Sequence, residues 1–329
     1  MNSTAKRVGA AAVAALFVAA CGGSAASPSA SALTGEITID GSSTVYPITE
    51  AVAEEFQNAN SGVQVTVAFS GTGGGFKKFC AGETDANDAS RPIKTTDKPG
   101  ADGIEGTADD ELSEATNCKN AGVEYVELKV AIDALAVVVS KENTFVDCLT
   151  TAELKSIWDL GSTVTTWADV RAGWPAEKID LYGPGADSGT FDYFTEVING
   201  KTDQSRSDYT ASEDDNTLVA GIAGSRYALG YFGLAYVTEN ADKVRAVEID
   251  GGKGCTAPSA EAANDGTYVP LGRPLFVYPS KAALARPEVA AFFRFFLENT
   301  NELSASVGYI GLNDADLAAS KAALESAIE

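Results

Sequence analysis

The chain has 329 residues, with 46 Asp or Glu against 24 Lys or Arg, so its formal net charge is −22. An acidic chain without a concentrated basic stretch does not suit nucleic acid, because such binding needs a basic face. The sequence contains no histidine, which excludes Ser-His-Asp and Cys-His catalysis. Carboxylate chemistry remains open, but most other enzyme classes are excluded.

The N-terminus predicts an export signal. Lys6 and Arg7 precede an apolar run over residues 8–20, and Cys21 follows immediately. The run is shorter than the roughly 20 residues needed to cross a bilayer, and its layout is typical of a cleavable signal peptide. The end of the run resembles a bacterial lipobox, so we expect residues 1–20 to be removed and Cys21 to carry acyl chains that hold the protein to the cell membrane. The alternative is a buried free cysteine.

Residues 21–34 are rich in Gly, Ser and Ala and predict a flexible tether after the lipidated cysteine. The remaining mature chain, roughly 300 residues, suits two domains rather than one. Strand-like and helix-like segments alternate along it, which predicts an α/β architecture. The clearest expected helices span residues 151–158, 190–198 and 287–299, and the first of them has capping-box spacing between Thr150 and Glu153.

Four cysteines remain after the tether, and an even number in an exported chain predicts two disulfides. These residues are Cys80, Cys118, Cys148 and Cys255. Sequence alone permits three pairings. We favour Cys80–Cys118 and Cys148–Cys255, because each pair then falls within one expected domain; reduced, buried thiols are the alternative. With the cysteines oxidised, no ordinary zinc site remains.

Residues 95–117 are polar, acidic and rich in Gly, and they predict a surface loop. Asp102, Asp109 and Asp110 lie within it, but the spacing of an EF-hand calcium loop is absent. We therefore expect a solvated loop and no bound metal.

One local pattern occurs three times: a predicted strand, a turn of Gly, Ser and Thr, and a predicted helix. The turns span residues 41–44, 70–75 and 183–190. Helix N-termini expose unpaired N–H groups, glycine lets an anion approach the backbone, and hydroxyls add donors. Each turn alone is common loop punctuation. Three of them converging on one cleft would form a cage for an anion.

Two enzymatic motifs fail in these turns. Phe76 and Lys77 stand where a phosphate-binding P-loop requires Gly-Lys. Ser188 does not lie in a G-x-S-x-G nucleophile elbow, and no histidine could activate it. The repeated turns therefore favour binding over catalysis.

The turns also carry a family resemblance. Residues 41–47, 69–75, 89–92 and 187–190 resemble the phosphate-binding subunit of phosphate ABC importers (the PstS family), and residues 228–233 and 273–275 also fit. The resemblance implies a type II periplasmic binding protein fold, with a ligand cleft between two α/β lobes joined by hinge strands. We expect residues 35–135 in lobe 1, residues 136–270 in lobe 2, and residues 271–329 returning to lobe 1.

The resemblance also implies a set of phosphate ligands. The first turn would offer two hydroxyls and the backbone N–H of Val45, the second turn two hydroxyls, and the third turn two hydroxyls and the N–H of Gly189. The full set of expected ligands is Ser43, Thr44, Val45, Ser70, Thr72, Ser90, Arg91, Asp187, Ser188, Gly189 and Thr190.

The charged ligands depart from the pattern of the best-known family members. Those place an aspartate in the segment that matches Ser90-Arg91 and an arginine at the position of Pro184. We infer an exchange, in which Arg91 supplies the cation and Asp187 the carboxylate, with Asp88 as the fallback acceptor. The alternative is that Arg91 and Asp187 pair with each other or face solvent. An ionised carboxylate would accept a hydrogen bond from the proton of phosphate and would disfavour sulfate, which has no proton.

The sequence thus predicts a monomeric, lipid-anchored binding protein that captures inorganic phosphate and delivers it to the membrane permease of an ABC importer, without cofactor or catalysis. Within this class the other candidate ligands are sulfate and molybdate. An exported phosphatase is the alternative from another class, and a surface sensor or adhesive lipoprotein is a third.

Overall fold

The computed structural model describes residues 33–104, 107, 109–186 and 188–329. The chain divides into two units at residues 32 and 33, and the described residues all belong to the second unit. The expected signal peptide, Cys21 and most of the tether lie outside the described residues, as does Asp187. Among the described helices, none has the length and apolar character that a membrane span requires.

A mixed sheet with strand order β2-β1-β3-β12-β4-β8-β6-β7 forms the framework, and β9 pairs with β4. In its first half, β1 pairs in parallel with β2 and with β3, while β12 is antiparallel to both β3 and β4. These strands are β1 (Gly35–Gly41), β2 (Val63–Val67), β3 (Ala86–Ala89), β4 (Leu128–Ser140) and β12 (Gly272–Pro279).

In the second half, β8 pairs in parallel with β6, which pairs in parallel with β7. A separate small sheet has the order β11-β10-β5. The strands are β5 (Cys148–Thr150), β6 (Asp180–Gly183), β7 (Thr210–Ala211), β8 (Ala228–Gly233), β9 (Val244–Ala246), β10 (Glu248–Asp250) and β11 (Cys255–Thr256).

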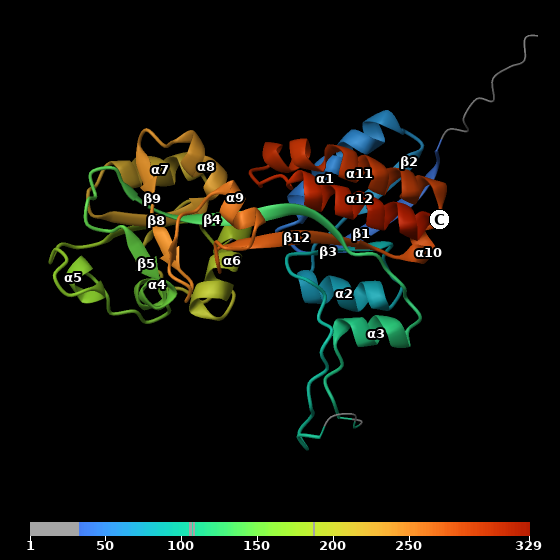
Figure 1. Ribbon diagram of the computed structural model, residues 1–329, viewed down its shortest axis with the longest axis horizontal. Helices are drawn as coiled ribbons and strands as arrows, with labels where there is room; N and C mark the ends of the chain where they lie inside the picture. The colour runs from blue at the N-terminus through green and yellow to red at the C-terminus, as the bar shows by residue number, and fades with distance from the viewer. Residues whose placement is uncertain (1–32, 105–106, 108, 187) are drawn as a thin grey trace, which may run out of the picture. The chain divides into compact units, whose positions relative to one another are not determined.

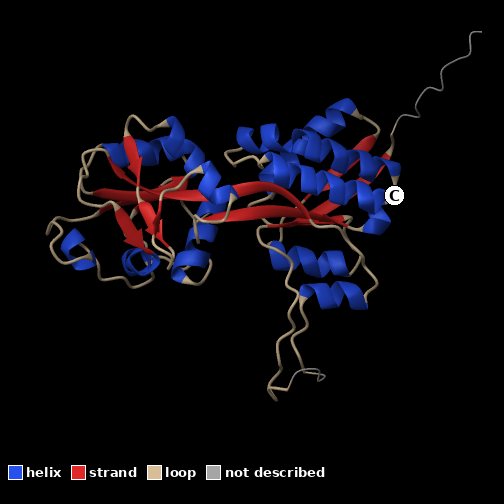
Figure 2. Cartoon of the chain, viewed as in Figure 1, coloured by secondary structure: helices blue, strands red, loops and turns tan. Residues whose placement is uncertain are grey.

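Strand β4 links the two halves. Its residues 128–134 pair with β12, and its residues 135–139 pair with β8. Figures 1 and 2 show β4 and β12 as long neighbouring strands that run from one group of helices to the other. These two strands therefore connect the halves covalently and pair with each other along the connection.

Separate hydrophobic cores define two lobes. In lobe 1, Ile37, Ile48 and Phe292 pack in one buried cluster, which joins early strands to a late helix. Helices α1, α11 and α12 cover one face of this part of the sheet, and α2 and α3 lie on the other face (Figure 1). The helices of lobe 1 are α1 (Tyr46–Ala59), α2 (Thr72–Cys80), α3 (Glu114–Asn120), α10 (Lys281–Leu284), α11 (Pro287–Ser306) and α12 (Asp314–Ile328).

Lobe 2 has two clusters, one on each face of its strands. Trp158, Trp167 and Tyr231 belong to the first, and Ile222 and Phe232 to the second. Its helical segments are α4 (Thr151–Trp158), α5 (Trp167–Val170), α6 (Gly189–Phe194), the π-helical turn η1 (Thr195–Asn199), α7 (Asp215–Ala223), α8 (Leu234–Glu239) and α9 (Ala260–Asn264).

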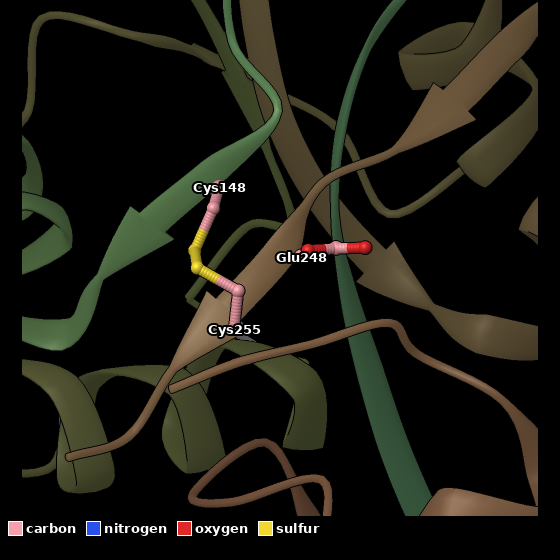
Figure 3. A group of neighbouring side chains, drawn as sticks. All are labelled: Cys148, Glu248 and Cys255. Atoms are coloured by element: carbon pink, nitrogen blue, oxygen red, sulfur yellow. A yellow bond between two sulfur atoms is a disulfide. The ribbon is translucent and has the colours of Figure 1, made fainter. Parts of the chain in front are cut away.

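Both favoured disulfides are present. Cys80–Cys118 joins α2 to α3, and Cys148–Cys255 joins β5 to β11. Figure 3 shows the second bond beside Glu248 of β10, the strand that lies between β5 and β11. The pairing is as favoured from the sequence, and each bond stays within one lobe.

One of the three expected helices matches at both ends, and the other two differ. The helix expected over residues 190–198 is divided into α6 (Gly189–Phe194) and the π-helical turn η1 (Thr195–Asn199). Helix α4 spans Thr151–Trp158 as expected, and Thr150 and Glu153 form the predicted capping box. The expected helix 287–299 continues to Ser306. The expected loop 95–117 is too long, because α3 begins at Glu114, where the Ser113 side chain accepts a hydrogen bond from the Thr116 amide and caps the helix.

Candidate functional site

A cavity of about 490 Å³ lies where the two lobes and the linking strand β12 meet. Its walls bring together the first turn, the second turn and the segment after β3 from lobe 1, and residues of α6 and η1 from lobe 2. The residues used below are Ser42, Ser43, Thr44, Gly71, Thr72, Gly73, Ser90, Arg91, Asp192, Tyr193, Glu196 and Arg273. Four of the residues expected from sequence to bind the ligand through side-chain oxygens therefore share this cavity: Ser43, Thr44, Thr72 and Ser90.

The guanidinium of Arg273 contacts residues of both lobes inside the cavity. Its Nε donates to Asp133 Oδ2 at 3.2 Å, and its Nη2 donates to Thr44 Oγ1 at 3.1 Å. The guanidinium carbon lies 3.5 Å from the ring centroid of Tyr193, a cation–π contact. Arg273 thus contacts the first turn of lobe 1 and a helix of lobe 2 at the same time.

The backbone fixes this ion pair. Arg273 of β12 stands opposite Asp133 of β4 in the antiparallel register. Burial raises the pKa of Asp133, and the charge of Arg273 works in the opposite direction. From the sequence, Arg273 was expected only as part of a family motif, without a role at the site. The sequence could have indicated Arg273 because it is a charged residue directly before an apolar strand over residues 275–278. No neighbouring residue indicated Asp133 as its partner.

The first turn is held by its own backbone. The Ser42 amide donates to the Asp88 carbonyl at 2.9 Å, and Ser42 Oγ accepts from the Thr44 amide at 3.2 Å. The Val45 amide donates to the Ser42 carbonyl at 3.2 Å, and the Val45 side chain is buried away from the cavity wall. The turn therefore presents the Ser43 and Thr44 hydroxyls to the cavity, while the expected N–H of Val45 already has a partner.

Of the two hydroxyls expected from the second turn, one lies at the cavity and the other does not. Thr72 Oγ1 accepts from the Ser90 amide at 3.2 Å and lies 3.1 Å from Ser90 Oγ, so Thr72 and Ser90 form one polar wall of the cavity. Ser70 Oγ instead donates to Asp40 Oδ1 at 2.7 Å, and Ser70 is not among the residues that line the cavity. Lys78 also pairs with Asp40.

Close packing explains one glycine of this turn. A Cβ atom on Gly75 would lie 2.0 Å from Asn87 Oδ1 and 2.5 Å from the Gly41 Cα. Helix α2 therefore approaches β1 and β3 so closely that only glycine fits. This approach brings the start of α2, at Thr72, next to the first turn.

The third turn lies beside the first. Ser188 Oγ accepts from the Thr190 amide at 3.2 Å and caps α6. A Cβ atom on Gly189 would lie 3.6 Å from Thr44 Oγ1. Ser188, Gly189 and Thr190 do not line the cavity themselves, but the next turns of their helix do, through Asp192 and Glu196. Asp187 lies outside the described residues.

Arg91 lines the cavity as part of an ion pair that the sequence did not predict. Its Nη1 and Nη2 donate to the two carboxylate oxygens of Glu114 at 2.8 and 2.7 Å. Burial acts to raise the pKa of Glu114, but the hydrogen bonds from Arg91 and from the Lys94 amide outweigh it, so the pKa is lowered. Glu114 is the first residue of α3, and the Cys80–Cys118 disulfide holds that helix against α2.

Asp88, the fallback acceptor, lies in the core below the first turn. It is fully buried, and among the described residues neither carboxylate oxygen has a hydrogen bond of normal geometry. Burial raises the pKa of Asp88 to about 8; the nearby Thr49 hydroxyl acts in the opposite direction, and the charge of Asp40 adds to the rise. Asp88 is not part of the cavity wall, so it supports the turn from beneath.

Two α/β lobes that share crossing strands and enclose a polar cleft define a solute-binding protein. Residues 26–300 match the model of the PBP superfamily domain. The chain is 45% identical over 286 residues to Protein SphX of Synechococcus elongatus, covering 86% of this chain and 79% of the relative. It is 35% identical over 318 residues to the phosphate-binding protein PstS of Staphylococcus saprophyticus, covering 96% of this chain and 92% of the relative.

A solved structure agrees with these relatives. The crystal structure of a possible phosphate binding protein from Planctomyces limnophilus has 50% sequence identity and a TM-score of 0.82, and the match covers 90% of this chain and all of that chain. The chain therefore belongs to the PBP superfamily and, within it, to the PstS family. This is a family of solute-binding proteins, so the protein acts by binding and is not an enzyme.

We predict that Asp88→Asn stabilises the protein at high pH. The pKa of Asp88 is raised to about 8 in the folded protein, whereas an unfolded aspartate titrates near 4. Between these values the unfolded chain releases a proton that the folded protein keeps, so the stability of the wild type falls as pH rises. Asparagine has the shape of the neutral acid, and we expect it to raise the free energy of unfolding by roughly 1–3 kcal/mol at pH 8.

Urea unfolding at pH 4.5 and at pH 8 measures this difference, which should be small at the lower pH and largest at the higher. Asp242→Asn, at an exposed carboxylate, is the matched control and should show no such trend. A variant that is less stable than the wild type at pH 8 would show that the Asp88 carboxylate is favourably paired.

Proposed function

We propose that this protein captures inorganic phosphate outside the cytoplasm and delivers it to the permease of an ABC importer. The observation that carries the proposal is the Arg273 guanidinium in a cleft whose lobe 1 walls are Ser/Thr/Gly turns. The names of the relatives support the same ligand, since the staphylococcal proteins are phosphate-binding proteins.

The donors of the cleft suit a tetrahedral oxyanion. Arginine has five N–H groups, and the hydrogen bonds to Asp133 and Thr44 use two of them. The hydroxyls of Ser43, Thr72 and Ser90 lie along the same cavity. A guanidinium and several hydroxyls can together bind the oxygens of one oxyanion. The net negative charge of the chain does not prevent this, because binding depends on local donors.

Proton recognition is the proposed source of selectivity. We keep Asp187 as the carboxylate that accepts a hydrogen bond from the proton of phosphate, and Ser188, Gly189 and Thr190 as ligands that would contribute once the lobes close. Ser70 and Val45 also stay proposed ligands, but both belong to lobe 1, and each would first have to release its present partner, Asp40 or Ser42. Arg91 would act together with Glu114 rather than as a free cation. Binding between two lobes would favour a closed form of the protein, and this form would dock on the permease.

We predict saturable one-to-one binding of inorganic phosphate, measured by titration calorimetry on the phosphate-stripped soluble domain that starts after Cys21.

Arg273→Lys keeps the positive charge but loses the planar guanidinium, so we expect phosphate binding about 10- to 100-fold weaker, as for the loss of hydrogen bonds to a charged group. Sulfate should give no heat with the wild type, and Asp187→Asn should admit sulfate.

Arg294→Lys is the matched control, because Arg294 pairs with Glu325 on the helices of lobe 1 outside the cavity. This control should bind phosphate as the wild type does. Equal binding of sulfate and phosphate by the wild type would support an oxyanion site but contradict the role proposed for Asp187. Silence with phosphate, sulfate and molybdate alike would refute the oxyanion proposal and favour a surface sensor or adhesive lipoprotein.

Lipid anchoring through Cys21 is the proposed means of attachment to the membrane. The basic pair, the apolar run over residues 8–20 and Cys21 support it. We predict that the full-length protein partitions into the detergent phase of a Triton X-114 extract and that Cys21→Ser moves it to the aqueous phase. Ser24→Ala serves as the control. Detergent partitioning that survives Cys21→Ser would contradict acylation at this cysteine.

A further inference from the structure

Glu196 brings a negative charge into the cleft from lobe 2. It belongs to η1 and lines the cavity. Its Oε2 lies 3.7 Å from Arg273 Nη1, within ion-pair distance but longer than a hydrogen bond. A carboxylate at this distance from Arg273 partly neutralises the positive charge that would attract an oxyanion ligand.

The two partners of this ion pair differ in freedom. The Arg273 side chain is 14% exposed, is bonded to Asp133 and Thr44, and stacks on Tyr193, so it has little room to move. The Glu196 side chain is 54% exposed, and its carboxylate is held by an ion pair to Arg273 that is longer than a hydrogen bond. Glu196 can therefore turn away from Arg273 at little cost, whereas Arg273 cannot follow it.

Glu196 acts on more than one charge of the cleft. Its carboxylate contributes to raising the pKa of Arg91, after the larger effect of the hydrogen bonds that Arg91 donates to Glu114. It also contributes to raising the pKa of Asp192 to about 6, after burial and the neighbouring Asp203. The charge of Glu196 thus acts on Arg273, Arg91 and Asp192.

We propose that Glu196 is a built-in competitor for the anion: its carboxylate partly neutralises Arg273 and is displaced when an oxyanion binds. This inference rests on the proposed function, and it adds that the affinity of the site is held below the value that its donors alone would give. The site would then still capture phosphate but would release it more readily than the same site without the Glu196 carboxylate. The same competition would apply to any tetrahedral oxyanion that Arg273 holds.

Replacing Glu196 tests this proposal directly. Glu196→Gln removes the charge and keeps the shape, and Glu196→Ala removes the charge and the side chain. Titration calorimetry with inorganic phosphate should show both variants binding about 3- to 10-fold tighter than the wild type, a size in keeping with a partly exposed ion pair and an added like-charge repulsion. Glu239→Gln, at an exposed carboxylate of α8, is the matched control and should change the Kd less than twofold.

The outcomes separate the alternatives. Weaker phosphate binding by both variants would mean that the Glu196 carboxylate contacts phosphate directly, and this result overturns the proposal. Tighter binding by Glu196→Gln alone would show a new hydrogen bond from the amide and would also overturn it, as would unchanged binding by both. Thermal unfolding without phosphate checks that each variant is folded. No binding of phosphate by the wild type and by both variants would contradict the proposed function itself, and with it this inference.

Discussion

The ion pair between Arg273 and Asp133 is the constraint on which the cleft depends. Both residues are largely buried, with side chains 14% and 8% exposed, and both lie on the strands that link the lobes. A buried ion pair is weak evidence for stability, because desolvation offsets much of its attraction. The Arg273–Asp133 pair instead positions the cation, because the strand register holds Arg273 where the two lobes meet. Losing Arg273 would leave Asp133 buried without its counter-charge.

The polar walls around this cation follow from the sheet topology. Strands β1 and β3 end at Gly41 and Ala89, and polar segments of the cleft follow directly after them. Strand β6 ends at Gly183, and the cleft residues of lobe 2 lie further along, in α6 and η1. In open α/β sheets, ligands bind beyond the carboxyl ends of the strands. The first turn and the segment with Ser90 and Arg91 meet for this reason, since β1 and β3 are parallel neighbours. Helix α2 adds Thr72 to the same wall.

The sequence predicted the parts of this protein that depend on local pattern. Alternation along the strands, the capping box at Thr150 and the Gly/Ser/Thr turns each occupy a short window, and the structure contains all of them. The family resemblance added the two-lobed arrangement. Within the candidate site, Ser43, Thr44, Thr72 and Ser90 were predicted from the family resemblance of their segments, because Ser and Thr residues in a single turn are common in loops and helix caps.

The charged residues of the cleft could not be predicted in the same way, because their partners lie far away in the sequence. Asp133 and Arg273 are 140 residues apart and meet only through the register of β4 and β12. Glu114 reaches Arg91 because α3 packs against α2, a contact that the disulfide fixes but no periodicity indicates. Glu196 faces the cleft through the π-helical turn η1, which departs from the regular helix expected over residues 190–198. π-Helical turns of this kind are often found at functional sites.

A crystal structure of the protein with bound phosphate would show whether Arg273 on the linking strand holds the ligand. We expect a phosphate oxygen at about 3 Å from a guanidinium nitrogen of Arg273, with the Thr44 and Thr72 hydroxyls donating to the same anion. A phosphate ion bound elsewhere in the cleft, with Arg273 still bonded only to Asp133, Thr44 and Glu196, would show that Arg273 is not the ligand-binding cation.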